Sequence, residues 1–281
     1  MGYTRYSLDD RAARALAAGY GTRGRDELFT QQKERRIHPS MDPRQARLRE
    51  SRDSAAHPNS IPIILALDVT GSMLTIPHQL VVDGLPKLMG AILQHSFPDP
   101  QVLFLAVGDH ECDHYPLQVG QFESGDAELD LWLTRTFLES GGGGNGGESY
   151  LLAYAFAAWR TAHDAWDKRH RKGLLFTLGD EPCLENLPPA ALREVMLEEQ
   201  DRNWSFGELL RLAQQKYEVY HLHVLQGSQG RASLSFWQQR LGDHCLAVAD
   251  IAEIPALIAR TVIAHAAGAE NPANATVEDL L

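Results

Sequence analysis

The chain has 281 residues, of which 44% are hydrophobic and 22% charged, as is typical of a globular protein with one large domain. Its net charge of −11 is uneven: residues 1–57 carry 12 Lys/Arg and 8 Asp/Glu, so residues 58–281 carry 14 and 29, a net of −15. So acidic a body argues against nucleic acid as a main partner, because phosphate binding needs a positive surface.

Membrane and secreted classes are also disfavoured. Apolar runs such as "IPIILAL" and "VLFLAV" are far too short to cross a bilayer. The amino terminus lacks the apolar stretch and cleavage site of a signal peptide. The 3 cysteines are widely spaced and odd in number, so they do not form a disulfide framework. We therefore expect a cytoplasmic protein.

From residue 59 the chain alternates apolar strands with amphipathic helical segments. Strands are predicted at 61–68, 101–109, 115–122, 173–180, 218–225 and 244–250, and helices at 78–96, 126–138, 149–159, about 190–198, 205–216 and 251–268. Pro86 should bend or interrupt the first helix, because proline lacks the N–H of the helical ladder. This alternation predicts an α/β fold with a doubly wound, mostly parallel sheet and helices on both faces, Rossmann-like in plan.

Three regions follow from these patterns. Residues 1–58 form a mildly basic, largely irregular arm that we expect to lie on the acidic body, or alternatively to dock another protein. Residues 59–268 form the domain. Residues 269–281 form a solvated acidic tail.

One motif suggests a protease. Residues 110–114 read His-Glu-Cys-Asp-His, which satisfies the zinc-protease pattern H-E-x-x-H. Zinc proteases place both histidines on one face of a helix, whereas this stretch leaves an apolar strand at Gly108 and ends at Pro116. A structural zinc on His110, Cys112 and His114 is no better supported, because such sites use spaced pairs of ligands. We interpret the motif as a polar loop at a strand end.

Oxygen-bearing side chains gather where strands are predicted to end. Asp68, Thr70 and Ser72 follow the first strand at alternate positions, and Asp180 follows the strand at 173–180. The carboxyl ends of parallel strands form the usual ligand-binding crevice, and hard oxygen ligands suit Mg²⁺, with Mn²⁺ or Ca²⁺ as alternatives. The glycine loop 140–149 would add a ligand over the top, from Asn145, Glu148 or Ser149.

These residues resemble the metal-ion-dependent adhesion site (MIDAS) of von Willebrand factor A (vWA) domains, and the glycine loop resembles that of intracellular bacterial members. Asp68, Thr70 and Ser72 match the family's Asp-x-Ser-x-Ser pattern, with Thr at the middle position, and Asp180 matches its later Asp. Asn145 stands where those members often have Asp. The resemblance covers about residues 59–266.

The resemblance implies a protein-binding domain without catalysis. Ser72, Thr70 and the second loop would hold the cation directly, and Asp68 and Asp180 mostly through water. An acidic side chain of a partner protein would complete the coordination. Bacterial relatives tend to work beside AAA-type ATPases or beside kinases and phosphatases.

Two other interpretations remain open. In the first, Asp68, Thr70 or Ser72 serves merely as a helix cap, although capping explains one oxygen and not three. "ILALDVTGS" also resembles the first motif of haloacid-dehalogenase phosphatases. There Asp68 would be the nucleophile, Asp180 and Glu185 would hold Mg²⁺, and Lys168 or Lys172 would neutralise the phosphate. Thr70 weighs against this, because it replaces the carboxylate that such enzymes use as acid/base.

Overall fold

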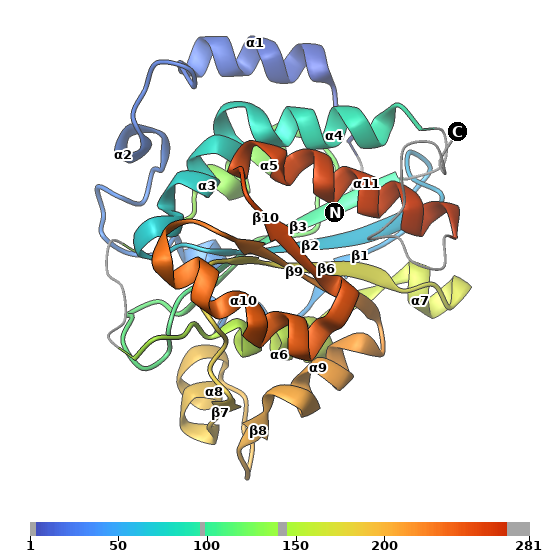
Figure 1. Cartoon of the computed structure of the whole chain (residues 1–281). Coiled ribbons are helices and arrows are strands. Elements are labelled where there is room, and N and C mark those ends of the chain that lie inside the picture. The colour runs from blue at the N-terminus through green and yellow to red at the C-terminus, as the bar shows by residue number, and fades with distance from the viewer. Residues whose placement is uncertain (1–3, 96–98, 140–144, 269–281) are drawn as a thin grey trace.

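The computed structural model describes residues 4–95, 99–139 and 145–268, and a six-stranded sheet runs through its centre (Figure 1). The strand order is β10-β9-β6-β2-β3-β4. The strands are β2 (Ser60–Asp68), β3 (Asp99–Val107), β4 (Leu117–Val119), β6 (Gly173–Gly179), β9 (Tyr217–Val224) and β10 (Cys245–Val248). Only β4 runs antiparallel to its neighbour within this sheet. The predicted doubly wound, mostly parallel α/β fold is confirmed.

The direction of winding reverses beside β2. The chain passes from β2 to β3 on one side, and it later adds β6, β9 and β10 on the other side. Loops that leave β2 and β6 therefore diverge, which opens a crevice at the carboxyl ends of these two strands. Asp68 is the last residue of β2, and Asp180 directly follows β6. Two residues of the predicted metal site thus lie at this crevice.

Helices cover both faces of the sheet (Figure 1). One face carries α3 (Thr75–Gln79), α4 (Leu85–Leu93), α5 (Asp126–Thr134) and α11 (Ile254–Ala267), and the other carries α6 (Tyr150–Arg160), α8 (Pro189–Met196), α9 (Phe206–Gln214) and α10 (Gly227–Leu241). Alternate residues of β2 supply the two cores: Ile63 and Leu65 pack on the first face, Ile64 and Ala66 on the second. Burial on both faces explains why this strand is an unbroken apolar run.

The helical segment after β2 is interrupted, as Pro86 predicts. α3 leads into a π-helical turn, η3 (Leu80–Gly84), in which the N–H of Leu85 donates to the carbonyl of Leu80. α4 begins at this point, with Pro86 in its first turn. Proline has no backbone N–H, so it cannot donate the hydrogen bond that a residue within a helix makes to the preceding turn. The helix therefore breaks before Pro86 and restarts with Pro86 in the first turn of α4, where no N–H donor is needed.

The 15-residue helix α10 was not predicted. Its sequence contains Gly227 and Gly230, and glycine is a weak helix former. The structure needs Gly230 for close packing, since a Cβ there would lie 2.3 Å from the carbonyl oxygen of Val224 in β9. Trp237, fully buried among the aromatic side chains of the second face, anchors the helix.

The amino-terminal arm contains a helix that was not predicted, α1 (Leu8–Ala18), which lies on the first face beside α4 and α5, whereas Ala46 of the arm packs in the core of the second face. Arg11 of α1 is only 1% exposed and pairs with Asp130 of α5 at 2.7 Å. Arg14 pairs with Asp126 at 2.6 Å. Farther along the arm, β1 (Arg49–Ser51) pairs in parallel with β5 (Thr161–His163) outside the main sheet. Basic residues of the arm thus bind acidic residues of the body.

The remaining elements are short. They are α2 (Arg25–Leu28), α7 (Asp164–Arg169), β7 (Asn186–Leu187), β8 (Trp204–Ser205), and the 3-10 turns η1 (Pro39–Met41), η2 (Gly71–Leu74), η4 (Gly242–His244) and η5 (Ile251–Glu253). Within the described residues, no helix has the length and apolar character needed to cross a membrane. The predicted tail, 269–281, lies outside the described residues.

Candidate metal site at the carboxyl ends of the strands

Asp68 is fully buried at the end of β2, and the loop that follows folds back onto it. Its Oδ1 accepts the backbone N–H of Thr70 and the Thr70 hydroxyl, both at 2.8 Å. Its Oδ2 accepts the Tyr150 hydroxyl at 3.3 Å. Gly71 has a φ of +38°, a conformation that glycine adopts readily, and it turns the chain into η2. The first loop therefore directs a carboxylate and a hydroxyl to one point.

Glu148 reaches the same point from the end of the glycine loop. Its Oε1 lies 2.9 Å from the Thr70 hydroxyl, which is also bonded to Asp68. A hydroxyl has one proton, so it can donate to only one of these two carboxyl groups. In the metal-free protein, the geometry is therefore satisfied when one of the two carboxyl groups is protonated and donates to the Thr70 hydroxyl.

The pKa values agree with a crowded acidic site. Burial, followed by the charge of Asp68, raises the pKa of Glu148 to about 10. Burial also raises the pKa of Asp68 to about 7, hydrogen bonds from Thr70 oppose the rise, and the charge of Asp180 adds to it. Smaller acidic contributions to Glu148 come from Asp109 and Asp113. A bound cation would relieve this repulsion.

The loop after β6 holds the end of the glycine loop in place. The backbone N–H of Glu148 donates to the carbonyl of Pro182 at 2.9 Å, and the carbonyl of Glu148 accepts from Leu184 at 3.0 Å. Asp180, at the start of this loop, is 5% exposed. Gly179 is required for close approach, because a Cβ there would lie 1.9 Å from the Tyr150 hydroxyl and 2.9 Å from Asp68 Oδ2.

Asn145, in the glycine loop, contacts the loop that follows β3 and not the first loop. Its Nδ2 donates to Asp109 Oδ2 and to Glu111 Oε2, both at 2.7 Å. Ser149 also belongs to this neighbourhood, since its Oγ accepts the backbone N–H of His110 at 2.9 Å. Asp109 is fully buried. Of the three second-loop candidates, Glu148 is the one that contacts Thr70.

The H-E-x-x-H stretch forms a turn between β3 and β4 and has no helix on which to place its histidines. The His110 ring lies 2.7 Å from Ser149 Oγ through Nδ1, and the backbone N–H of His114 donates to Glu139. Across the described part of the chain, His, Cys, Asp and Glu side chains nowhere form a group of three or more placed to hold a metal ion on their own. The interpretation of a polar loop agrees with this geometry.

The residues at the crevice nevertheless fit a cation that also uses hydroxyl ligands. Glu148 Oε2 is buried and has no hydrogen-bond partner, so one carboxylate oxygen at the crevice is unsatisfied. A buried carboxylate oxygen without a partner costs free energy, and a bound ion or a proton would remove that cost. The backbone of Ser72 lies in η2, whereas its side chain and residues 140–144 lie outside the described residues.

Sequence reasoning missed Tyr150. This residue is fully buried, and its hydroxyl donates to Asp68. Its ring packs edge-on against His221 and Trp237 at 5.4 Å. The one available signal was its position as the first helical residue after the glycine loop, and that position also suits an ordinary core aromatic.

Comparison with known proteins gives results at the level of fold. No protein-family pattern matches the chain, and no curated protein matches it. Among solved structures, the pilus adhesin SpaC of Lactobacillus rhamnosus GG, in its open conformation, superposes with a TM-score of 0.50 at 10% identity, over 78% of this chain and 31% of the adhesin. The fold is von Willebrand factor A-like.

Two weaker likenesses belong to mussel byssus proteins. Proximal thread matrix protein 1 gives a TM-score of 0.46 at 12% identity, over 74% of this chain and 48% of that one. A structure of the same protein, described as having a zinc-occupied MIDAS motif, gives 0.44 at 12% identity, over 77% and 49%. The chain spans less than half of the length of each of these solved structures.

Proposed function

We propose that this chain is a non-enzymatic, metal-dependent protein-binding domain of the vWA type. Asp68, Thr70 and Ser72 on the first loop, Glu148 at the end of the glycine loop and Asp180 after β6 would hold a divalent cation. Mg²⁺ is the expected ion, because the donors are hard oxygens and the ion tolerates several waters. Asn145 would not contact the cation itself and would act indirectly, by positioning Asp109.

A single observation carries this proposal. The Thr70 hydroxyl lies within 2.9 Å of two buried carboxyl groups, Asp68 and Glu148, and the second oxygen of Glu148 has no partner. Like charges so close are unfavourable unless a proton or a cation lies between them. The location at the winding reversal of a parallel sheet supports ligand binding rather than a purely structural role.

The charge of the body suggests what the cation would attract. Residues 58–281 carry a net of −15, from 14 Lys/Arg and 29 Asp/Glu, so the surface would repel an acidic partner. A cation would supply local positive charge at the crevice. We propose that the partner protein presents an Asp or Glu side chain there, and that it is an AAA-type ATPase, a kinase or a phosphatase.

Metal binding is tested by thermal unfolding. MgCl₂ or MnCl₂ should raise the melting temperature of the wild type above its value in EDTA, because a ligand of the folded state stabilises by mass action. Asp68→Ala and Glu148→Gln should each abolish that rise. Asp201→Ala removes an exposed carboxylate elsewhere and should leave it intact. A rise that survives in both site variants would show that the ion binds elsewhere.

Partner binding is tested by capture from lysate. We expect a protein that is retained in Mg²⁺, released by EDTA, and not retained by Ser72→Ala, which removes a hydroxyl without a change of charge. Replacing the partner's contacting Asp or Glu by Ala should prevent binding. Retention that is indifferent to EDTA would contradict a cation-dependent contact.

The lysines and Glu185 that the phosphatase interpretation requires are engaged elsewhere or lie far from Asp68. Lys168 pairs with Asp164 at 2.6 Å, and Lys172 directly precedes β6 whereas Asp180 directly follows it. Seven residues of strand span roughly 20 Å, so neither lysine lies near Asp68. Glu185 pairs with Arg240. We therefore propose that Asp68 forms no covalent intermediate, and that aryl phosphates are not hydrolysed in Mg²⁺. Hydrolysis that depends on Asp68 would overturn this.

A further inference from the structure

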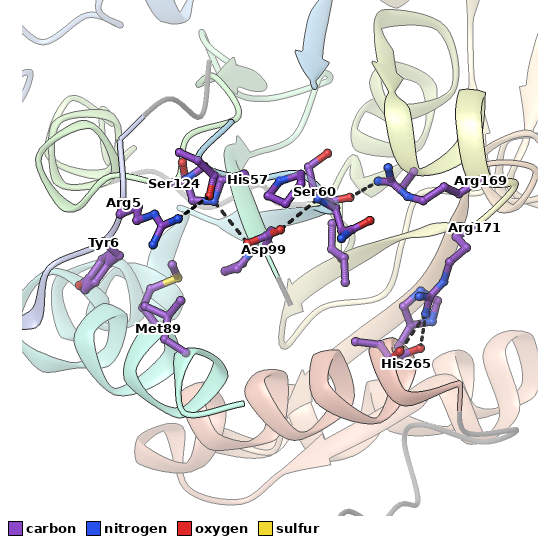
Figure 2. A pocket seen from close by; sticks show the side chains of 18 of the residues that line it. Arg5, Tyr6, His57, Ser60, Met89, Asp99, Ser124, Arg169, Arg171 and His265 are labelled. Atoms are coloured by element: carbon purple, nitrogen blue, oxygen red, sulfur yellow. Dashed lines mark hydrogen bonds and ion pairs between the residues drawn. The ribbon is translucent and has the colours of Figure 1, made fainter. Parts of the chain in front are cut away.

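A large cavity lies at the opposite end of the sheet from the candidate metal site. It has a volume of about 780 Å³ and lies where β2 and β3 begin, and just before β6 (Figure 2). Segments far apart in the sequence line it: the arm, α4, α7 and α11. Ligand pockets commonly have volumes of roughly 300–1,000 Å³, so this one has the capacity for a small organic molecule.

The lining is cationic, although the body is acidic. Arg5, Arg169, Arg171 and Lys172 line the cavity, and among the described residues Asp99 is its one lining carboxylate. Arg169 is neutralised by Asp53 at 2.7 Å and Lys172 by Glu218 at 3.0 Å. Counting these two partners, the cavity retains an excess of positive charge, which is the reverse of the charge of the surrounding domain. Such a local reversal concentrates anions.

Two of the arginines keep donors for a ligand. Arg171 uses its Nη2 to bond the carbonyls of His265 and Ala266 at 3.1 and 3.0 Å, which also fixes the guanidinium at the end of α11. Among the described residues, Arg5 bonds only the carbonyl of Ala56, at 3.3 Å. A guanidinium has five N–H donors, so each retains several. Figure 2 shows both side chains at the edge of the same cavity.

A buried polar atom adds an independent indication. His57 lines the cavity, is 5% exposed, and its Nδ1 has no hydrogen-bond partner. Its Nε2 lies 2.8 Å from the carbonyl of Thr4, which leaves Nδ1 as the atom in need of a partner. Asp99 Oδ1 is 3.6 Å from this atom, beyond hydrogen-bond distance. Buried polar atoms are usually satisfied, so a ligand at this position would complete the site.

Part of the cavity lining is apolar. Ile61 at the start of β2, together with Met89 and Leu93 of α4, supplies it. Cationic donors and aliphatic carbons in one lining favour a ligand with both characters. We propose that this cavity binds a small organic anion, in which an apolar body carries a phosphate or carboxylate group that Arg5, Arg171 and Lys172 hold. This site is separate from the metal site and does not depend on its function.

The test uses a matched pair of fluorescent probes in EDTA, which removes any contribution of bound cations. 8-Anilinonaphthalene-1-sulfonate carries an anionic group on an aromatic body, and N-phenyl-1-naphthylamine is its uncharged counterpart. We expect saturable one-site binding of the sulfonate, its displacement by phenyl phosphate, and much weaker binding of the amine. Equal binding of both probes, or no displacement, would overturn the proposal.

Variants locate the site. Arg5→Gln with Lys172→Gln should weaken binding of the sulfonate at least about tenfold, because two charge-assisted contacts are lost. The control, Lys87→Gln with Arg193→Gln, removes the same charge outside the cavity lining and should change affinity little. Cooperative thermal unfolding of each variant establishes that it is folded. If the double variant Arg5→Gln/Lys172→Gln is destabilised, Arg5→Gln alone is used, and we expect it to lose affinity for the sulfonate several-fold. Unchanged affinity in a folded cavity variant would overturn the assignment.

Discussion

At the scale of single residues, Asp68 is placed where burial and charge conflict. Its carboxyl is fully buried, and burial raises its pKa to about 7, against hydrogen bonds from Thr70 that favour the charged form. A structural role alone does not explain a carboxylate in this position, since an asparagine would accept the same two bonds from Thr70. The conflict is typical of a residue retained for binding.

Asp68→Asn should therefore stabilise the metal-free protein. Because the pKa of Asp68 is higher in the folded state than in the unfolded state, its contribution to folding stability is full below about pH 4. That contribution is lost as the pH rises from about 4 to about 7. At pH 8 the charge is fully unfavourable. A pKa rise of roughly three units, at about 1.4 kcal/mol per unit, means that removing the charge should raise the free energy of unfolding by on the order of 4 kcal/mol in EDTA. Urea unfolding measures this. In Mg²⁺ the sign should reverse, and a variant less stable than wild type in EDTA would refute the argument.

At the scale of elements, the arm is attached through a buried ion pair. Arg11 of α1 bonds Asp130 of α5, donates to the carbonyl of Val81 in η3, and lies over the ring of Tyr20 at 4.8 Å. Burial raises the pKa of Asp130 although Arg11 and Arg14 oppose the rise. The pair therefore makes the position of α1 specific, because neither charge is tolerated alone in that environment.

Arg11→Ala should cost about 3–5 kcal/mol of unfolding free energy, since it leaves Asp130 buried without its main partner. Arg14→Ala is the matched control: its side chain is 32% exposed, so its loss should cost about 1 kcal/mol or less. Asp130→Asn in the Arg11→Ala background should recover part of the loss. Denaturant unfolding of the four proteins measures these differences, and equal losses for Arg11 and Arg14 would contradict the argument.

His163, in the strand β5 that pairs with β1, should make the folding stability depend on pH. His163 ends β5 and caps α7, where its Nδ1 accepts the N–H of Trp166 at 3.1 Å. Burial, aided by the nearby Lys216, lowers its pKa to about 4. The folded state thus favours the neutral ring, so stability is full above about pH 6.5 and is lost as pH falls toward 4, where only the unfolded chain is protonated.

His163→Gln, which cannot be protonated, should remove that dependence. The stability advantage of wild type over the variant should shrink by about 2–3 kcal/mol between pH 7 and pH 4, at roughly 1.4 kcal/mol per unit of pKa shift. Urea unfolding at a series of pH values measures it, with His95→Gln at a helix end as the control. A constant difference across this range would show that the ring is protonated in the folded state.

At the scale of the whole molecule, the two candidate sites occupy opposite ends of one sheet. The seven residues of β6 separate Lys172 from Asp180, a span of roughly 20 Å. Perturbations at that separation, without shared contacts, generally add. The rise in melting temperature caused by Mg²⁺ should accordingly be the same in wild type and in the Arg5→Gln/Lys172→Gln variant. A rise altered by more than experimental error would reveal coupling through the sheet.

Much of the architecture follows from local pattern. Strands buried on both faces, such as β2, are apolar without interruption, and Pro86 interrupts its helix for a reason that is entirely local. Helix α10 could not be predicted in this way, since its glycines are weak helix formers and Trp237 is stabilised only by the packing it finds. α1 likewise depends on a partner, Asp130, that lies more than a hundred residues away.

For the candidate sites too, some features follow from local sequence and others depend on tertiary packing. The sequence by itself determined that Asp68 ends one buried strand and that Asp180 follows another, because strand ends are marked by local pattern, whereas the strand order that puts both at a winding reversal came from the structure. Only the tertiary structure decided that Glu148, and not Asn145, meets Thr70, since that choice depends on how the glycine loop is bonded to the loop after β6. It alone also brought Arg5 and Arg171 to one cavity, because residues so far apart in the chain become neighbours only through packing.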